Sequence, residues 1–485
     1  MVKPRELKMS ITPTLTTLGG VTVAHARVLV LGGGVTGRSV AQVLSNMGAE
    51  ISVYDENESS EFNFHRATLN DVSNINWAAA IVSPGWRPSH PIIADLRNRE
   101  IPLLNEIDLA WEIKQQVAPG QKWLAVTGTN GKTSTVELTE AILKAAGVNA
   151  FACGNVGTPV IDAVTSDHRY EYLILELSSF QLHWAESAEF VAGSILNIAL
   201  DHIDWHGSFA EYAEAKLDLL SRSVTAILNG DDVSVVEGSA HWQGRKVFYT
   251  LQTPKPGEIG LVEDLLVDRA FVIDPMEAAM FCELGEVQPT APHSVSNALA
   301  AAGLARVIGI DHEVIREAIK KFRPGRHRIE LVLEQNGIRW IDDSKATNPH
   351  AAQASLMSQL SVVWIAGGLA KGAEMNDLIT QVGSRLRGVI LIGTDRELIA
   401  HELENKFPNV ALVRIDPKTG HDRSSADNEF MNQIVTAAKL LAQDGDAVLL
   451  APACASMDQF VSYGDRGDRF AKSVREIVGK NDNAS

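Results

Sequence analysis

The stretch WLAVTGTNGKT, residues 123–133, decides the fold of the middle of this chain. Residues 123–126 are apolar and predict a buried strand, and residues 132–146 have the spacing of a helix. The glycine-rich turn between them directs backbone N–H groups and a helix N-terminus at phosphate oxygens. Lys132 adds a positive charge for the outer phosphates, and the Thr133 hydroxyl is a ligand for Mg²⁺. The stretch predicts a nucleotide phosphate loop, although Val126 stands where the common pattern has its first glycine.

A second glycine turn follows the apolar strand RVLVL, residues 27–31. Gly32, Gly34 and Gly37 have Gly-x-Gly-x-x-Gly spacing, and Asp55 closes the next strand about 20 residues further on. By itself this pattern fits an NAD site, a site for another nucleotide, or a tight turn without a ligand.

Polar residues also stand near strand ends in the middle of the chain. Glu176 lies in the predicted strand 172–177 and is a candidate Mg²⁺ ligand, because ligands bind at the carboxyl ends of strands in open α/β sheets. His202 follows the predicted strand 194–198, where a lone histidine fits either a site or a turn. Lys216, in the helical stretch 211–220, is by itself typical of a solvated surface lysine.

Three polar loops follow predicted strands in the last part of the chain. They are DDSKATNP at 342–349, GGLAKG at 367–372 and PACASMDQF at 452–460. Because parallel strands share a carboxyl edge, we expect the loops to converge there. Cys454 has no histidine near it in the sequence, which favours packing over nucleophilic chemistry.

The alternation of strands and helices predicts an α/β protein of three domains. We expect a Rossmann-like N-terminal domain (1–120), a central domain resembling P-loop ATPases (121–325) and a Rossmann-like C-terminal domain (326–485). The polar stretch 114–121 and the turn at 323–325 mark the boundaries. Residues 233–287 show no regular pattern, and residues 1–26 suggest no role.

Composition narrows the class of protein. The 485 residues carry a net charge of −17, which argues against a general nucleic-acid binder. The three cysteines are widely spaced, so neither a disulfide framework nor a zinc site is expected. The first ten residues lack the apolar core of a signal peptide, and no apolar run approaches the roughly 20 residues of a membrane helix. We expect a cytoplasmic protein without a membrane span.

Along all three sections the chain resembles the Mur ligases of peptidoglycan synthesis. TGTNGKT, residues 127–133, is the ATP loop of that family and is shared with folylpolyglutamate synthetases. DSKATN (343–348) and SMDQF (456–460) are more specific and resemble the members that add D-glutamate; ELSSFQL (176–182) agrees with them. Ser294 and Ala451 depart from the residues common in the family, which puts one nucleotide contact and one hydroxyl contact in doubt.

The resemblance implies an ATP-dependent ligase acting on UDP-N-acetylmuramoyl-L-alanine and D-glutamate, with the first glycine turn holding the UDP diphosphate. It implies Mg²⁺, in two ions, and a monomer. Lys216 matches the family's carbamylated lysine, whose carboxylate helps to hold the second ion. Lys132, His202 and Lys216 are the implied catalytic residues. The implied ATP contacts are Gly128, Thr129, Asn130, Gly131, Lys132, Thr133, Asn297, Arg328 and Asp343. The implied metal ligands are Thr133, Glu176, His202 and Lys216 as carbamate. The implied substrate contacts are Thr36, Asp55, Ser83 and Asn155, and, for D-glutamate, Lys345, Thr347, Lys371, Ser456 and Phe460.

Three alternatives stay open. A sister ligase of the Mur or folylpolyglutamate type would add a different residue, such as a diamino acid, or a glutamate onto folate, and the C-terminal loops would choose the amino acid. An NAD-dependent dehydrogenase would use the first glycine turn but leaves the phosphate loop unexplained. A nucleotide-binding regulator without catalysis leaves the three C-terminal loops unexplained.

Overall fold

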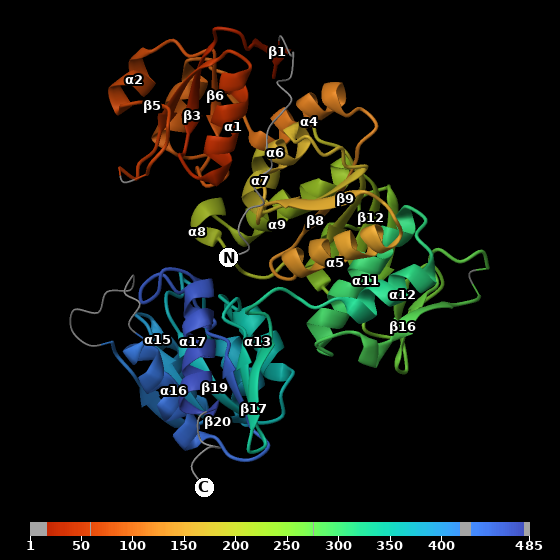
Figure 1. Ribbon diagram of the computed structural model, residues 1–485, viewed down its shortest axis with the longest axis vertical. Coiled ribbons are helices and arrows are strands. Elements are labelled where there is room, and N and C mark those ends of the chain that lie inside the picture. The colour runs from red at the N-terminus through yellow and green to blue at the C-terminus, as the bar shows by residue number, and fades with distance from the viewer. Residues whose placement is uncertain (1–16, 59, 275, 418–427, 480–485) are drawn as a thin grey trace.

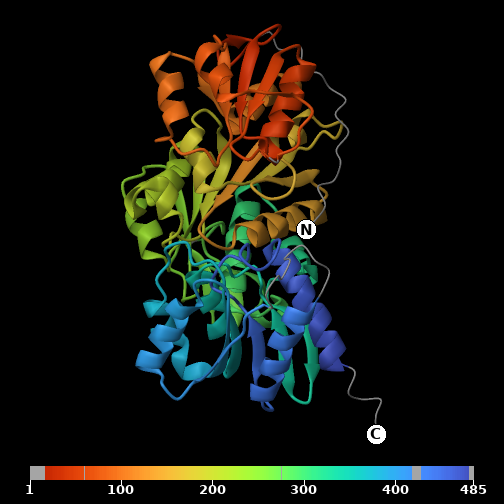
Figure 2. The ribbon, with the colours of Figure 1, turned by 90° about the vertical axis from the view of Figure 1, so that its left-hand side faces the viewer.

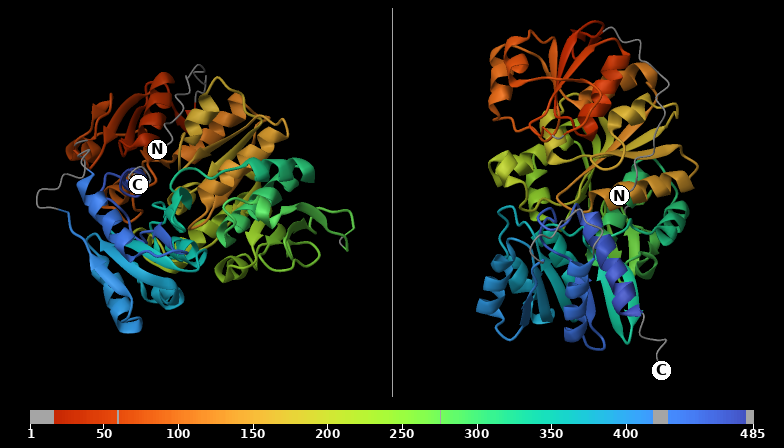
Figure 3. Two further views of the ribbon diagram at one scale, coloured as in Figure 1. Left: turned by 60° about the horizontal axis from the view of Figure 1, so that its bottom comes forward. Right: turned by 60° about the vertical axis from the view of Figure 1, so that its left-hand side comes forward.

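The computed structural model describes residues 17–479, apart from residues 59, 275 and 418–427. Three large sheets follow one another along the long axis, with the N-terminal sheet at one end and the C-terminal sheet at the other (Figures 1 and 2). The right-hand view of Figure 3 shows the same order. Each of these three sheets is mostly parallel and covered by helices, which confirms the predicted α/β class. We propose domain boundaries at residues 120/121 and 325/326, because this division keeps each sheet whole.

The N-terminal sheet is parallel, with strand order β5-β4-β3-β6-β7. Its strands are β3 (Arg27–Leu31), β4 (Glu50–Tyr54), β5 (His65–Arg66), β6 (Ala79–Val82) and β7 (Leu103–Leu104). Its helices are α1 (Val35–Asn46), α2 (Leu69–Asn74) and α3 (Pro91–Asn98), and a hairpin of β1 (Thr17–Leu18) and β2 (Val21–Thr22) precedes them. A Cβ at Gly37 would overlap the carbonyl oxygen of Gly32, so the glycine lets α1 begin directly after β3.

The central sheet has nine strands in the order β16-β15-β14-β13-β12-β11-β8-β10-β9. The strands are β8 (Lys122–Thr127), β9 (Ala150–Gly154), β10 (Tyr172–Glu176), β11 (Phe190–Ile195), β12 (Ser223–Asn229), β13 (Arg245–Tyr249), β14 (Ile259–Val262), β15 (Leu265–Asp268) and β16 (Ala279–Glu283). The helices are α5 (Lys132–Ala145), α6 (Val160–Thr165), α7 (Ser179–Trp184), α8 (Ile203–His206), α9 (Phe209–Leu217), α10 (Val233–Gly238), α11 (Pro292–Val307) and α12 (His312–Lys321), with short 3₁₀ turns at Asp218–Arg222 and Leu284–Glu286.

The position of β8 in the sheet determines where the phosphate loop lies. It lies between β10 and β11 in parallel register, with Glu176 opposite Val126 and Ile195 opposite Thr127. The ends of the three strands are therefore level at the carboxyl edge of the sheet. Residues 233–287, which the sequence left unassigned, form α10, β13 and an antiparallel extension of β14, β15 and β16 at the far edge.

The C-terminal sheet has the order β17-β18-β22-β19-β20-β21, antiparallel only between β17 and β18. Its strands are β17 (Glu330–Gln335), β18 (Ile338–Asp342), β19 (Val362–Gly367), β20 (Leu386–Ile392), β21 (Ala411–Arg414) and β22 (Ala447–Leu450). The helices are α13 (Pro349–Met357), α14 (Asn376–Val382), α15 (Arg396–Lys406), α16 (Glu429–Leu441) and α17 (Tyr463–Ile477), and a 3₁₀ turn spans Gly383–Arg385. Because β18, β19 and β22 are parallel neighbours, the three polar loops leave the same edge, as the sequence predicts.

Helix α4 (Glu106–Val117) joins the N-terminal and central domains. It packs on α6, and α1 also contacts α6, so one apolar core runs through both domains. Ser39 Oγ donates a hydrogen bond of 2.7 Å to Asp162 across the same junction. Within the described residues, no helix combines the length and apolar character needed to cross a membrane.

Candidate active site

A cavity of about 340 Å³ lies where the carboxyl edge of the central sheet meets the C-terminal domain. Its walls come from the phosphate loop, the ends of neighbouring strands, the start of α11 and the loop after β18. The sequence-predicted residues that line it are Thr129, Asn130, Gly131, Lys132, Thr133, Asn155, Glu176, His202, Asn297, Arg328, Asp343, Lys345 and Thr347. Residues more than 200 positions apart thus share one cavity.

The phosphate loop is held in shape by its neighbours. Gly131 caps α5 with a φ of 87°, and a Cβ there would overlap the side-chain oxygen of Asn297. Glycine is therefore required, and Asn297 lies directly against the loop. The backbone N–H of Asn130 donates to Asn197 Oδ1 at 2.8 Å, and Asn197 Nδ2 donates to the Asn130 carbonyl at 3.1 Å.

Two lysines meet at the carbonyl oxygen of Gly128. Lys132 Nζ donates to it at 2.8 Å and to the Thr129 carbonyl at 3.0 Å, while Lys216 Nζ donates to it at 2.9 Å. Lys216 is only 2% exposed, so the interpretation as a solvated surface lysine is wrong. Burial, and then the charge of Lys132, lower the pKa of Lys216 well below its ordinary value.

The carboxylate of Glu176 is buried at the end of β10. Asn155 Nδ2 donates to its Oε1 at 2.9 Å. Its Oε2 has no hydrogen-bond partner among the described residues, although it is buried beside the cavity. A buried carboxylate oxygen without a donor suits a cation, and Mg²⁺ prefers such oxygen ligands. The residues therefore fit the implied metal.

His202 immediately precedes α8 (Ile203–His206) and has a left-handed backbone conformation, with a φ of 53°. Its Nε2 lies 3.7 Å from Asp201 Oδ2, and its ring packs edge-on against Phe180 at 4.7 Å between centroids. Burial lowers the pKa of His202 most, Asp201 opposes the shift, and the charges of Lys216 and other lysines add to it. A neutral imidazole is the form that binds metal.

The C-terminal domain contributes charged groups to the opposite wall. Burial raises the pKa of Asp343 to about 6, although the Ser355 hydroxyl and the Ile329 N–H donate to its carboxylate. Burial, with the nearby Arg328, lowers the pKa of Lys345 to about 8. Lys345 is half-buried and lines the same cavity as the phosphate loop, and below pH 8 its amine is mostly protonated, so it can bind an anionic substrate.

The two domains also touch directly at the loop. Asn130 Nδ2 lies 3.0 Å from His350 Nδ1, and Asn348 Nδ2 donates to Asn130 Oδ1 at 3.1 Å. Asn348 caps α13 by accepting from the Ala351 N–H at 2.9 Å. The start of α13 is therefore seated on the phosphate loop.

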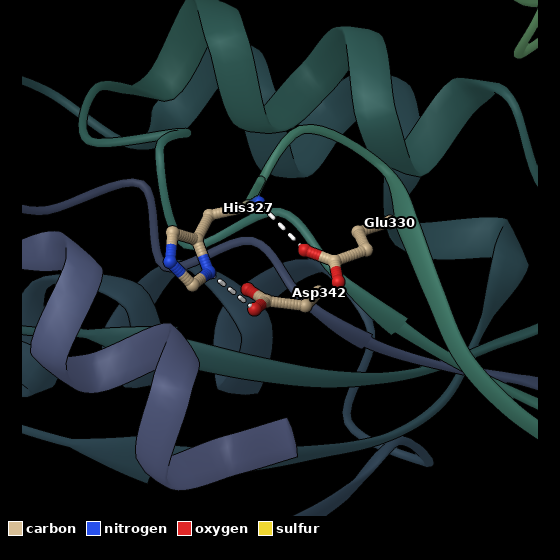
Figure 4. A group of neighbouring side chains, drawn as sticks. All are labelled: His327, Glu330 and Asp342. Atoms are coloured by element: carbon tan, nitrogen blue, oxygen red, sulfur yellow. Dashed lines mark hydrogen bonds and ion pairs between the residues drawn. The ribbon is translucent and has the colours of Figure 1, made fainter. Parts of the chain in front are cut away.

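The chain entering the C-terminal domain is fixed by His327 (Figure 4). Its ring Nδ1 lies 2.7 Å from Asp342 Oδ2, and its backbone N–H donates to Glu330 at 3.0 Å. Its carbonyl accepts from the Lys345 N–H at 3.2 Å. Arg328 follows at once, lines the cavity and donates to the Ser134 hydroxyl at 3.4 Å.

The predicted contacts of the first glycine turn lie in the N-terminal domain. Thr36 stands in the first turn of α1, and Ser83 Oγ donates to the Gly32 carbonyl at 3.5 Å. Asp55 accepts from the Gly33 N–H at 2.6 Å and from the Asn57 N–H at 2.8 Å. These residues surround one turn, apart from the cavity described above.

Three residues predicted for the D-glutamate pocket do not line the cavity. Lys371 is exposed, with a φ of 51°, and its charge acts on His202. Ser456 is 3% exposed in the loop after β22. Phe460 is 1% exposed and packs against Phe430 within the apolar core.

Cys454 is buried, and burial raises the pKa of its thiol to about 12, in line with a packing role.

Several residues of the site escaped the sequence analysis. Asn197 lies two residues beyond the end of β11, within the predicted strand 194–198, so a polar residue near the end of an apolar run was a usable signal. Tyr212 lies one helical turn before Lys216; its hydroxyl is 2.8 Å from Thr129 Oγ1, and its ring lies 4.7 Å from Lys216 Nζ. His350 carried no signal, because its contact depends on how two domains dock.

Family models match most of the chain. The Mur ligase middle domain matches residues 126–305, and the Mur ligase, glutamate ligase domain matches residues 327–454. The C-terminal domain of alanine dehydrogenase/PNT matches residues 4–83, over the first glycine turn.

Whole-chain comparisons agree. The chain is 45% identical to the UDP-N-acetylmuramoylalanine–D-glutamate ligase of Thermobifida fusca, over 93% of this chain and 99% of that one. It is 42% identical to the enzyme of that name from Streptomyces coelicolor, over 93% and 98%.

Solved structures share the fold. A pseudomurein peptide ligase type C from Methanothermus fervidus matches with a TM-score of 0.58 at 18% identity, over 93% of this chain and all of that one. The UDP-N-acetylmuramate-alanine ligase of Thermotoga maritima matches with a TM-score of 0.57 at 16% identity, with the same coverage. With its fold, its cavity and its relatives in agreement, the chain belongs to the Mur ligase family.

Proposed function

We propose that this chain is an ATP-dependent ligase that joins D-glutamate to UDP-N-acetylmuramoyl-L-alanine through an acyl phosphate. The observation that carries the proposal is the single cavity shared by a phosphate loop and by the loop with Lys345 and Thr347. Relatives that are more than 40% identical along nearly their full length carry the name of this activity. Such an enzyme works on cytoplasmic precursors, and we propose that it does so as a monomer.

The first step makes the substrate carboxylate reactive. A carboxylate oxygen of the L-alanyl group attacks the γ-phosphorus of ATP, the bond to the β,γ-bridging oxygen breaks, and ADP leaves. In this proposal the N-terminus of α5 and Lys132 bind the phosphates, Arg328 offsets charge from the opposite wall, and Asn297 contacts the nucleotide. Positioning and charge compensation supply most of the catalysis.

The second step forms the amide. The amine of D-glutamate attacks the acyl carbon, phosphate leaves, and the nitrogen gives up a proton. Lys345 and Lys371 are proposed to bind the two carboxylates of D-glutamate, with Thr347 and Ser456 as hydroxyl donors. Phe460 then acts through the backbone of its loop, because its side chain is buried in the core.

The metal site is proposed from three residues that line the cavity on the side of the central domain and from Lys216, which reaches the phosphate loop at the Gly128 carbonyl. Thr133, Glu176, His202 and a carbamylated Lys216 would hold Mg²⁺, which we infer as two ions that offset the negative charge of the phosphates. Carbamylation joins a neutral Lys216 amine to CO₂ and releases one proton. Burial supports this reaction, because it favours the neutral amine.

The direct test is phosphate release from ATP with UDP-N-acetylmuramoyl-L-alanine and one amino acid at a time. We expect release with D-glutamate, and little with L-glutamate, D-aspartate or a diamino acid. Release with a diamino acid at the same rate would favour a sister ligase. Reduction of NAD without ATP would favour the dehydrogenase instead.

A further inference from the structure

The turn that ends β6 in the N-terminal domain is held by the central domain at three successive residues. The Gly85 carbonyl accepts a 3.0 Å hydrogen bond from the indole N–H of Trp205. The Trp86 carbonyl accepts one of 3.3 Å from the indole N–H of Trp184, and Arg87 pairs with Asp204 at 3.0 Å. The turn begins with Ser83, whose hydroxyl meets the first glycine turn.

Within the central domain, ring contacts connect Trp205 to His202, which lines the active-site cavity. It lies in the four-residue helix α8, which begins directly after His202 and faces the N-terminal domain (Figure 1). The Trp205 ring is 9% exposed and packs against Phe180 at 4.7 Å between centroids. Phe180 also packs against His202 at 4.7 Å. A short rigid path therefore connects the glycine turn to His202.

Of these links, the indole bond to Gly85 is the most constrained. The Arg87–Asp204 pair is largely exposed, and such pairs contribute about 1 kcal/mol or less. The Trp205 indole is enclosed by aromatic rings, so its N–H has one direction available and meets the carbonyl there. A shift of the turn would leave that buried donor without a partner, which is costly.

We propose that Trp205 is a positioning residue, whose bond to Gly85 fixes the substrate-holding turn of the N-terminal domain relative to His202. We call the contacts of residues 85–87 with Trp184, Asp204 and Trp205 the latch. This proposal rests on the proposed function, in which a long substrate is held by its UDP end at the glycine turn and reacts at its carboxylate in the cavity. Binding at either end depends on one domain only. Reaction depends on the distance between the two, and a misplacement of about 1 Å costs up to about 10²-fold in rate.

The kinetic test uses Trp205→Phe, which keeps an aromatic ring and removes the donor. Turnover number with UDP-N-acetylmuramoyl-L-alanine should fall at least tenfold. The stoichiometry and Kd of UDP and of ADP, each measured by calorimetry, should stay within twofold of the native values. Unchanged turnover would overturn the proposal, and so would a loss of UDP or ADP binding as large as the loss of turnover.

A second pair of variants tests the proposal in case Trp205→Phe fails to fold. Asp204→Arg places a like charge opposite Arg87 and should lower turnover in the same way. Combining it with Arg87→Asp should restore much of the loss. Trp242→Phe, a partly buried tryptophan outside the latch and the cavity, is the matched control and should keep native turnover. Equal turnover in all these variants would refute the role of the latch.

A structural measurement tests the latch independently of the reaction. Spin labels at Ala94→Cys on α3 and Ala145→Cys on α5 report the distance between the two domains, because both sites are exposed and the three native cysteines are buried. Trp205→Phe should broaden the distance distribution, whereas Trp242→Phe should not. An unchanged distribution would overturn the proposal. If the native enzyme fails to use D-glutamate, the proposed function falls and this measurement still judges the latch.

Discussion

Replacing Glu106 by glutamine should stabilise the protein in a pH-dependent way. Glu106 begins α4, is 3% exposed, and accepts from the Ile161 N–H at 3.1 Å through Oε1. Its Oε2 has no hydrogen-bond partner among the described residues. Burial is the largest cause that raises its pKa from 4.5 to about 7.

The sign and size follow from proton linkage. Between pH 4.5 and 7 the folded state keeps a proton that the unfolded state loses, so stability is full below pH 4.5 and falls as the pH rises to 7. At about 1.4 kcal/mol per pH unit, the cost above pH 7 is about 3 kcal/mol. Glutamine carries no charge and keeps the acceptor for Ile161. We expect Glu106→Gln to be more stable by about 1–3 kcal/mol at pH 8 and by less than about 1 kcal/mol at pH 5.

The assay is urea unfolding at both pH values, followed by tryptophan fluorescence. Trp111 and Trp123 pack together 5.0 Å apart and belong to the same apolar core, so they report on this unit. Glu237→Gln, on the exposed face of α10, is the matched control and should change stability equally little at both pH values. A Glu106→Gln effect of the same size at pH 5 and pH 8 would refute the argument.

Three further predictions concern the reaction. Lys132→Ala should lower kcat by about 10²-fold or more with the fold intact by circular dichroism, because its charge acts mainly in the transition state; near-native turnover at saturating ATP would contradict the assignment. D-Glutamate should be preferred over L-glutamate and D-aspartate by up to ~10⁴-fold in kcat/KM, because a displaced carboxylate leaves the buried polar groups around Lys345 unpaired; equal values would contradict the predicted pocket. Lys216→Ala should lose most activity and regain part of it with a short-chain carboxylic acid, which replaces the carbamate oxygen at the metal. A fully active Lys216→Ala enzyme would leave the lysine a structural residue.

The sequence predicted the parts of this protein that depend on local pattern. The phosphate loop, the order of the three sheets and the polar loops at strand ends all follow from apolar runs interrupted by glycine. The strands β14, β15 and β16 could not be predicted, because they are short strands at a sheet edge within a stretch without clear periodicity. The burial of Lys216 also escaped the residue pattern, because its helix looks amphipathic and only the packing of α9 on the loop removes the lysine from water.

The least predictable features were contacts between domains. His350 and Asn130 are 220 positions apart, and nothing in either local sequence indicates that they meet. Phe460 shows a different limit. The family resemblance assigns it to the D-glutamate pocket, which stays a prediction, but could not show that its side chain is buried in the apolar core. The contact of Trp205 could not be predicted either, because it also joins two domains. Its partner is a backbone carbonyl oxygen, which every residue has.

The seating of Asn348 and His350 on the phosphate loop has a consequence for the timing of turnover. Because two domains form the walls of one cavity, we expect the release of ADP and phosphate to require that these polar contacts break and that the C-terminal domain moves away. Such a swing displaces much solvent, so release should slow in proportion to the viscosity of the medium, whereas bond-making inside the closed cavity should not. Weakening the contact with Asn348→Ala would then speed the exit of products while it shortens the time that the reactants spend enclosed.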